Sequence, residues 1–185
     1  MESKPLDNQT PSAGHPGEPD RLAAGGPYLC GDIDIRIGRD GTWFYHGSPI
    51  GRKPLVKLFA SVLKRDEGGD YWLETPVEKA RIQVDDAPFV AVAMEVSGEG
   101  VDQTLTFRSN LDEEVVAGKA APIRISIDAA SGEPSPYILF RPGLEALIAR
   151  AVFYDLVELA VEDPDTHILG IWSGGVFFPL GTGED

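Results

Sequence analysis

The alternating run Asp32–Ile37 is the feature of this chain that most restricts its fold. Charged and apolar side chains alternate along this run, which is the pattern of a β-strand with one buried face and one solvent-exposed face. An Asp40-Gly41 turn and the aromatic run Thr42–His46 follow, so the whole segment predicts a β-hairpin. A half-buried hairpin of this kind is typical of antiparallel sheets, which can leave one face in water.

Two stretches have the period of an amphipathic helix instead. Between Gly51 and Leu63, apolar residues recur at i, i+3, i+4, i+7 and i+8, which predicts a helix that ends at Lys64 and Arg65. The expected buried stripe consists of Leu55, Leu58, Phe59, Val62 and Leu63. A longer helix is predicted from Gly143 to about Ala160, with Leu156 on its buried side.

The order of the elements predicts an α+β protein made of two related β-β-α-β-β units with antiparallel sheets. The units are expected at residues 27–86 and 87–185, with an extra hairpin in the second. Trp72 and Trp172 have comparable positions after the two predicted helices, which suggests an internal duplication; convergent ordering of common elements is the alternative. Residues 1–26 are rich in Pro, Gly, Ser and Asp and are interpreted as a disordered tail.

The charge of the chain restricts its partners. Its 16 Lys and Arg residues face 30 Asp and Glu residues, so the formal net charge is −14. Nucleic acids and anionic membranes are therefore not expected as partners, because both attract proteins through local positive charge. The single cysteine, Cys30, can form neither an internal disulfide nor a thiolate metal site. No signal peptide, membrane span, phosphate loop or dinucleotide fingerprint occurs, which predicts a cytoplasmic protein without a cofactor.

A basic cluster on the first predicted helix is the leading candidate for a ligand site. Its cations are Arg52, Lys53, Lys57, Lys64 and Arg65. With backbone amides near Gly51 at the start of the helix, Arg52, Lys53 and Lys57 could bind a small anionic ligand. The alternative is the solvated back of an amphipathic helix, whose cations pair with Asp32, Asp34 or Glu78.

An acidic cluster with a histidine is the second candidate. It consists of Asp32, Asp34, His46 and Asp86, which could act as acid and base or bind a cation. The alternative is a solvated strand face and a turn in which the acids accept backbone amides. No metal is expected, because His46 and His167 lack the close ligand spacing of a metal motif.

Several motifs in a fixed order resemble an uncharacterised bacterial family known as domain of unknown function 1285. The matching segments are Gly31–Arg36, Arg39–Arg52, Thr75–Lys79, Asp85–Phe89, Arg141–Ile148, Phe153–Val157 and Trp172–Pro179. The resemblance covers the chain after the tail. It implies a cytoplasmic bacterial protein with repeated α+β motifs and a role in signalling, and it supplies no catalytic residues.

The leading functional hypothesis is a non-enzymatic module that binds a small ligand or another protein, because the interface between two units is a common ligand site. A hydrolase-like enzyme that uses the acidic residues of the first unit is one alternative. Another is a structural subunit that forms a homo-oligomer through its sheet edges. The Ser173-Gly174-Gly175 segment is interpreted as a tight hairpin turn rather than a nucleophile, because it lacks the flanking glycines of a nucleophile elbow.

Overall fold

The computed structural model describes residues 26–164 and 166–181, so the predicted tail at residues 1–26 lies outside it except for its last residue. The described residues are mostly β-structure with two short helices, and the α+β class is confirmed. Its first part contains β1 (Tyr28–Ile37), β2 (Trp43–Tyr45), β3 (Ser48–Pro49), α1 (Lys53–Ser61), β4 (Leu63–Arg65), β5 (Tyr71–Glu74) and β6 (Glu78–Val84). No helix in the described residues is long and apolar enough to cross a membrane.

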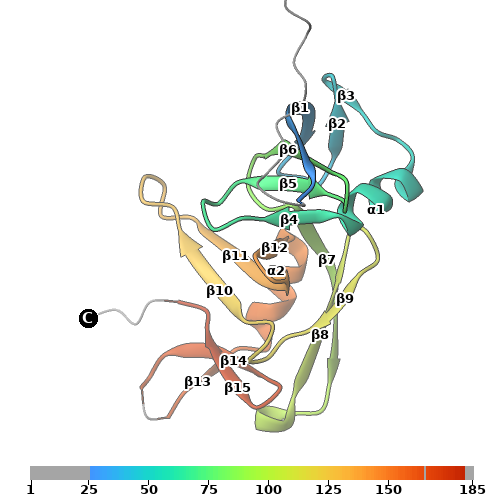
Figure 1. Ribbon diagram of the computed structural model, residues 1–185. Helices are drawn as coiled ribbons and strands as arrows, with labels where there is room; N and C mark the ends of the chain where they lie inside the picture. Colours follow the sequence, from blue (N-terminus) through green and yellow to red (C-terminus); the bar gives the residue numbers. More distant parts are fainter. Residues whose placement is uncertain (1–25, 165, 182–185) are drawn as a thin grey trace, which may run out of the picture.

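The first six strands form one mixed sheet, here called the N-terminal sheet, in the order β3-β2-β1-β6-β5-β4. Two antiparallel three-stranded meanders lie side by side, joined at the centre by the parallel pair β1 and β6 (Figure 1). The predicted hairpin is confirmed: Arg36 pairs with Phe44, and Gly41 has φ +81 in the turn. A residue with a side chain would be strained there.

The next part of the chain builds a second sheet with the same layout. It contains β7 (Phe89–Ser97), the 3-10 turn η1 (Gly100–Asp102), β8 (Thr104–Ser109), β9 (Glu114–Val116), β10 (Ile123–Ile127), β11 (Pro134–Arg141) and β12 (Leu144–Ile148). The order of this C-terminal sheet is β10-β11-β12-β7-β8-β9, with β7 and β12 as the parallel pair. The common strand order fits a repeated unit, but both sheets are mixed and not antiparallel as predicted.

The chain ends with α2 (Arg150–Glu158) and a small sheet of β13 (Val161–Glu162), β14 (Leu169–Ser173) and β15 (Val176–Pro179). The repeat therefore differs from the predicted one in the position of its helices. α1 lies between the two meanders of its sheet, whereas α2 follows the second meander. The predicted equivalence of Trp72 and Trp172 is wrong, since Trp72 lies in the N-terminal sheet and Trp172 in the small sheet.

Both helices are shorter than predicted. The segment Leu144–Ile148 is strand β12, because its residues alternate between buried and half-buried positions with a period of two. The first helix ends at Ser61, and the expected stripe residue Leu63 belongs to β4. Leu58 is 62 % exposed, and Phe59 is half-buried against Trp43 at a ring distance of 6.2 Å.

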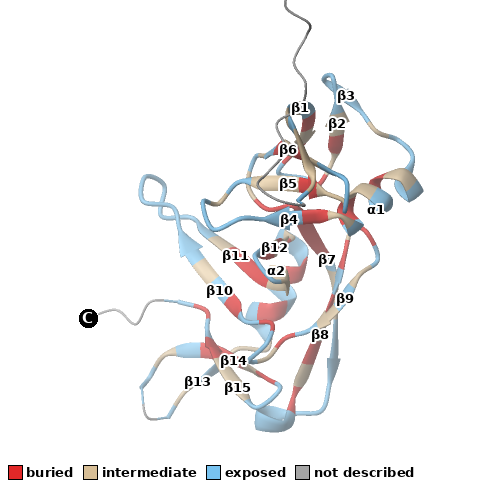
Figure 2. Ribbon diagram, viewed as in Figure 1, coloured by how far each residue is buried: buried red, intermediate tan, exposed pale blue. Residues whose placement is uncertain are grey.

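One continuous apolar core joins the two large sheets and both helices (Figure 2). Its most enclosed side chains are Ile37, Trp43, Phe89, Leu105, Phe107, Ile138, Leu144, Ile148, Leu156 and Ile171. Leu156 has no exposed surface, so its predicted burial is confirmed. Side chains from both sheets meet in this core, and polar groups where the sheets adjoin are consequently held in defined positions.

Candidate functional site

The lysines of the predicted basic site bind a carboxylate of the C-terminal sheet. Lys53 and Lys57 lie one turn apart on α1, and each places its Nζ 2.8 Å from a different oxygen of Asp112. These two lysines lower the pKa of Asp112 to about 2. Asp112 has φ +63 in the turn between β8 and β9, so the contact joins α1 to the C-terminal sheet.

The other three cations of the basic cluster differ in their contacts. Lys64 lies 2.8 Å from Glu74, and the Arg65 guanidinium donates to the Gly69 carbonyl. Arg52 is exposed just before α1, beside the exposed Gly51, and its guanidinium has no hydrogen-bond or ion-pair partner among the described residues. Of the five cations, Arg52 is thus the one most accessible to a ligand.

The predicted acidic cluster does not form one site. Asp34 lies 3.0 Å from His46 Nδ1 on the exposed β2–β3 hairpin, with both side chains 64 % exposed. Asp32, two residues before Asp34 on β1, instead binds Arg81 through both oxygens. Asp86 lies where the two sheets adjoin. The described residues contain no group of three or more potential metal ligands from His, Cys, Asp and Glu.

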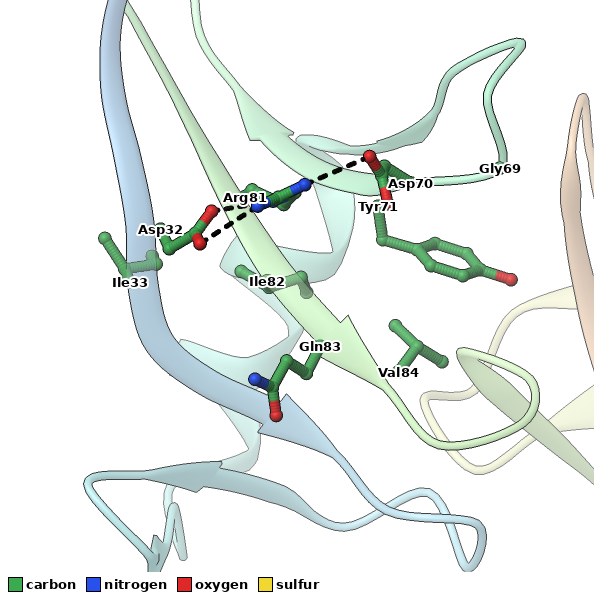
Figure 3. A pocket seen from close by; sticks show the side chains of 9 residues that line it. All are labelled: Asp32, Ile33, Gly69, Asp70, Tyr71, Arg81, Ile82, Gln83 and Val84. Atoms are coloured by element: carbon green, nitrogen blue, oxygen red, sulfur yellow. Dashed lines mark hydrogen bonds and ion pairs between the residues drawn. The ribbon is translucent and has the colours of Figure 1, made fainter.

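Figure 3 shows the pocket that contains Asp32, an open hollow of about 350 Å³ between β1, β5 and β6. The β1–β6 ladder shifts register between Asp32 and Arg36, which separates the strands there. Arg81 lies between two carboxylates, with Nε 2.6 Å from Asp32 and Nη1 3.2 Å from Asp70. These bonds lower the pKa of Asp32 and raise the pKa of Arg81, so the pair stays charged. The charged groups of this pocket are bound to one another.

Ser173 has a structural role. Its hydroxyl is buried, donates to the Ala117 carbonyl at 2.8 Å and accepts a hydrogen bond from the Leu105 amide at 2.9 Å. Gly174 and Gly175 have positive φ and form the tight turn predicted for this segment. A hydroxyl bound on both sides is unavailable as a nucleophile.

A second pocket lies where the two large sheets adjoin, and we call it the junction pocket. Its volume is about 330 Å³, and it is lined by Arg39, Asp85, Asp86, Ser126, Asp128, Ser135 and Tyr137. Arg39 comes from the β1–β2 turn, the two acids Asp85 and Asp86 from the β6–β7 connection, and the remaining residues from β10, β11 and their turn. Both sheets therefore contribute to this pocket.

Asp86 connects the two sides of the junction pocket. Tyr137 donates its hydroxyl to Asp86 Oδ1 at 2.7 Å, and Arg39 Nε lies 3.2 Å from Oδ2. Arg39 also donates from Nη2 to the Ser135 hydroxyl at 3.1 Å. The Asp86 side chain is only 19 % exposed, and its Oδ2 is buried without a hydrogen bond of good geometry. Burial and the bound carboxylate both raise the pKa of Tyr137.

Hydrogen bonds within two turns hold residues of the junction pocket in place. Asp40 accepts hydrogen bonds from the amide and hydroxyl of Thr42, which shapes the turn that carries Arg39. On the opposite side, Asp128 Oδ1 accepts from the amide and hydroxyl of Ser131, which shapes the β10–β11 turn. These bonds lower the pKa values of both carboxyls. The pocket is consequently built on two ordered turns and a short connection.

Of the junction-pocket residues, only Asp86 is a site candidate from the sequence. Arg39 and Asp85 lie in segments that carry the family resemblance but have no site role there, and no sequence pattern gives Tyr137 one. The one local signal was the pair of adjacent acids before Pro88, which was interpreted as a turn. Arg39 and Tyr137 are far apart in the chain, and no local pattern indicates that they meet.

The described pKa shifts favour the ordinary charge state of each group. Carboxyl values are lowered, as in Glu74 beside Lys64, and arginine values are raised, as in Arg124 beside Glu145. Tyrosine values are raised as well, since burial disfavours the phenolate of Tyr71. Shifts in these directions stabilise charges and hydrogen bonds at neutral pH and do not create a proton donor or acceptor poised near pH 7.

Comparison with known proteins agrees with the resemblance noted above. Residues 23–87 match the N-terminal domain, and residues 88–180 the C-terminal domain, of a protein family of unknown function, DUF1285. A DUF1285 family protein from Silicibacter pomeroyi DSS-3, with a crystal structure, is 50 % identical in sequence to this chain. The two structures have a TM-score of 0.80, and the match covers 91 % of each chain. A DUF1285 family protein from Shewanella baltica OS155, also with a crystal structure, is 28 % identical in sequence, with a TM-score of 0.54. That match covers 68 % of this chain and 91 % of the Shewanella chain. No curated protein matches the chain. This chain belongs to the DUF1285 family.

Proposed function

We propose that this protein is a non-enzymatic binding module and that the junction pocket is its ligand site. The observation that carries the proposal is Asp86, a largely buried carboxylate bound by Arg39 from one sheet and Tyr137 from the other. Burying a charge is costly unless it is well paired, so such a group at the wall of a pocket is an uncommon arrangement. Ligand sites often lie at such junctions, where a few polar groups converge.

The lining of the junction pocket favours a ligand rich in hydrogen-bond donors. Three carboxylates and one arginine line it, together with hydroxyls of Ser126, Ser135 and Tyr137. Arg36 neutralises Asp85, which leaves the pocket with a negative balance. The ligand is therefore a small neutral or cationic molecule with hydroxyl or amino groups, since an anion would meet repulsion from these acids.

The anionic ligand expected at the first helix stays a prediction and now depends on Arg52. Lys53 and Lys57 each bind Asp112, so they would have to leave a partner in order to bind an anion. Asp112 is itself the negative charge closest to that surface. The donor-rich ligand of the junction pocket requires no such exchange.

A binding role is favoured over hydrolysis because the resolved pKa shifts fix charges in their ordinary states. The acids of the hydrolase alternative also bind different partners: Asp32 binds Arg81, Asp34 binds His46, and Asp86 lies at the junction on Arg39. A ligand that contacts both sheets would change how firmly they are held together. Such coupling suits a cytoplasmic regulatory protein in bacterial signalling, and that role is part of the proposal.

A thermal-shift screen of sugars, polyols, amino acids and polyamines tests the proposal. A ligand at about 100 times its dissociation constant stabilises the native state by about 2.7 kcal/mol. For a chain of this size, that corresponds to a rise in melting temperature of about 5–10 °C.

Two variants locate the site. Asp86→Asn removes the carboxylate that carries the proposal and should abolish the shift given by the best compound, whereas Arg52→Gln lies outside the pocket and should leave the shift intact. The reverse result would favour the anion site at the first helix. If both variants kept the full shift, or if no compound of this class raised the melting temperature, the junction-pocket proposal would be wrong.

A further inference from the structure

Strand β10 is an unusually open sheet edge. It has five residues, Ile123–Ile127, whereas the other edge strands of the two large sheets, β3, β4 and β9, have two or three. It contains no proline, glycine, lysine or bulge, the features that usually protect an edge from pairing. Among the described strands, β10 forms a ladder with β11 alone, although β15 lies near it.

The free edge of β10 carries the main-chain groups of its isoleucines. The Asp128 amide donates to the Glu133 carbonyl, and the Leu139 amide donates to the Pro122 carbonyl. Residues 122 and 128 therefore turn their main-chain groups toward β11, and by alternation so do Arg124 and Ser126. The amides and carbonyls of residues 123, 125 and 127 point to the open side. The Ile127 side chain is also 48 % exposed.

Two side-chain atoms, one on β10 and one directly after it, lack partners of opposite charge. Arg124 binds Glu145 through Nε and Nη2, and its Nη1 has no hydrogen-bond or ion-pair partner among the described residues. Asp128 accepts all its hydrogen bonds at Oδ1, from Ala130 and Ser131, and its Oδ2 has none in the same part of the chain. These two atoms are complementary, but they lie at opposite ends of the strand.

We propose that two copies of this chain pair antiparallel through β10, with Ser126 facing Ser126 of the second copy. In this register Ile125 and Ile127 of one copy exchange main-chain hydrogen bonds with Ile127 and Ile125 of the other. Arg124 then lies opposite Asp128 of the second copy, which brings together the two incompletely paired groups. The exposed Ile127 side chains are covered by Ile125 side chains across the ladder.

The charge pattern selects this register over its nearest alternative. Pairing centred on Ile125 uses the same free main-chain groups, but it places Arg124 opposite Ser126 and Asp128 opposite Pro122. That arrangement leaves Arg124 Nη1 and Asp128 Oδ2 without a partner of opposite charge. The Ser126-centred contact is isologous, so it closes after two copies and joins two six-stranded sheets into one. Ser126 and Asp128 also line the junction pocket, so the pockets of the two copies lie next to each other.

Disulfide trapping tests the register directly. In the proposed pair, Ser126 faces its copy at a non-hydrogen-bonded position, where Cα atoms are about 4.5 Å apart, within the range of a disulfide. The full chain with Cys30→Ser and Ser126→Cys should form a covalent dimer on mild oxidation. Val116→Cys, on the opposite edge strand β9 and 50 % exposed, is the matched control and should form no covalent dimer. Equal cross-linking of the two variants, or none at Ser126→Cys, would overturn the proposal.

Ile127→Pro tests the pairing without a new cysteine. It removes an amide that faces the open edge and none that bonds to β11, so the fold should be retained. Light scattering should give twice the chain mass for the wild type and for Ile127→Thr, which keeps the amide, and the single chain mass for Ile127→Pro. A wild-type monomer across the accessible concentration range, or a dimer that survives Ile127→Pro, would refute the proposal. None of these measurements involves a ligand, so the result is independent of the proposed function.

Discussion

Leu156→Ala tests whether α2 and the sheets share one core, because Leu156 has no exposed surface. The substitution removes three carbons, which at about 0.8 kcal/mol each accounts for about 2.4 kcal/mol of lost transfer free energy. The cavity adds to this loss, and Leu→Ala substitutions in rigid cores cost about 2–5 kcal/mol in total. Neighbours in regular strands cannot collapse easily into the space, so we expect the free energy of unfolding to fall by about 3–4 kcal/mol.

Urea unfolding followed by tryptophan fluorescence measures this difference. The slope of free energy against urea should not change, and the midpoint should fall. Val157→Ala, at the next position on α2 and 40 % exposed, is the control and should change the free energy by less than about 0.5 kcal/mol. A loss below about 1 kcal/mol in Leu156→Ala would contradict the packing of α2. Two separate unfolding transitions in the wild type would contradict a continuous core.

Three further predictions address other parts of the fold. In Gly170→Ala the new Cβ would lie 2.4 Å from the Phe177 ring, so this variant should lose about 1–3 kcal/mol in the same urea assay. Ser173→Ala leaves a buried amide and a buried carbonyl without their partner and should cost about 1–3 kcal/mol by the same measurement. The two lysines on Asp112 lower its pKa from 3.8 to about 2, so the stability that this carboxylate contributes is complete above pH 4 and lost toward pH 2. Acid unfolding curves should therefore become flatter in this range for Asp112→Asn.

The sequence was most informative where local chemistry decides the structure. The hairpin over residues 32–46 follows from strict alternation and an Asp-Gly turn, and neither depends on the rest of the chain. The same holds for the turn at Gly174 and Gly175. In these segments a short pattern admits one backbone arrangement, so the prediction needed no knowledge of tertiary contacts.

The second helix was misplaced because its apolar residues fit two periods. Leu144, Leu147 and Ile148 continue the helical stripe of α2, but Leu144, Ala146 and Ile148 also alternate as in a strand. The position of Gly143 decides between the two. With φ +72 it forms a tight turn after β11 and returns the chain as β12. Tertiary pairing therefore overrode a local preference that was ambiguous in the sequence.

The candidate sites were predicted less well for a different reason. Composition identifies charged residues, but not which of them will be paired after folding. Asp32 and Lys53 both bind a partner far along the chain, Arg81 in one case and Asp112 in the other. The Arg39 contact with Asp86 likewise requires two turns to meet. Contacts of this kind depend on the three-dimensional arrangement of the sheets, which no local motif describes.

The two six-stranded sheets repeat one strand order, and the proposed dimer edge lies where the two sheets differ. In this order β4 is equivalent to β10, and both are edge strands. β4 is short and exposes two cations, Lys64 and Arg65, whereas β10 is longer, exposes Ile127 and carries one cation, Arg124, which Glu145 binds. The connection after β3 contains α1, but the equivalent connection after β9 is a short loop bound by Ser173. A repeated scaffold can therefore protect the outer edge of one sheet and leave the equivalent edge of the other sheet free to bind a partner.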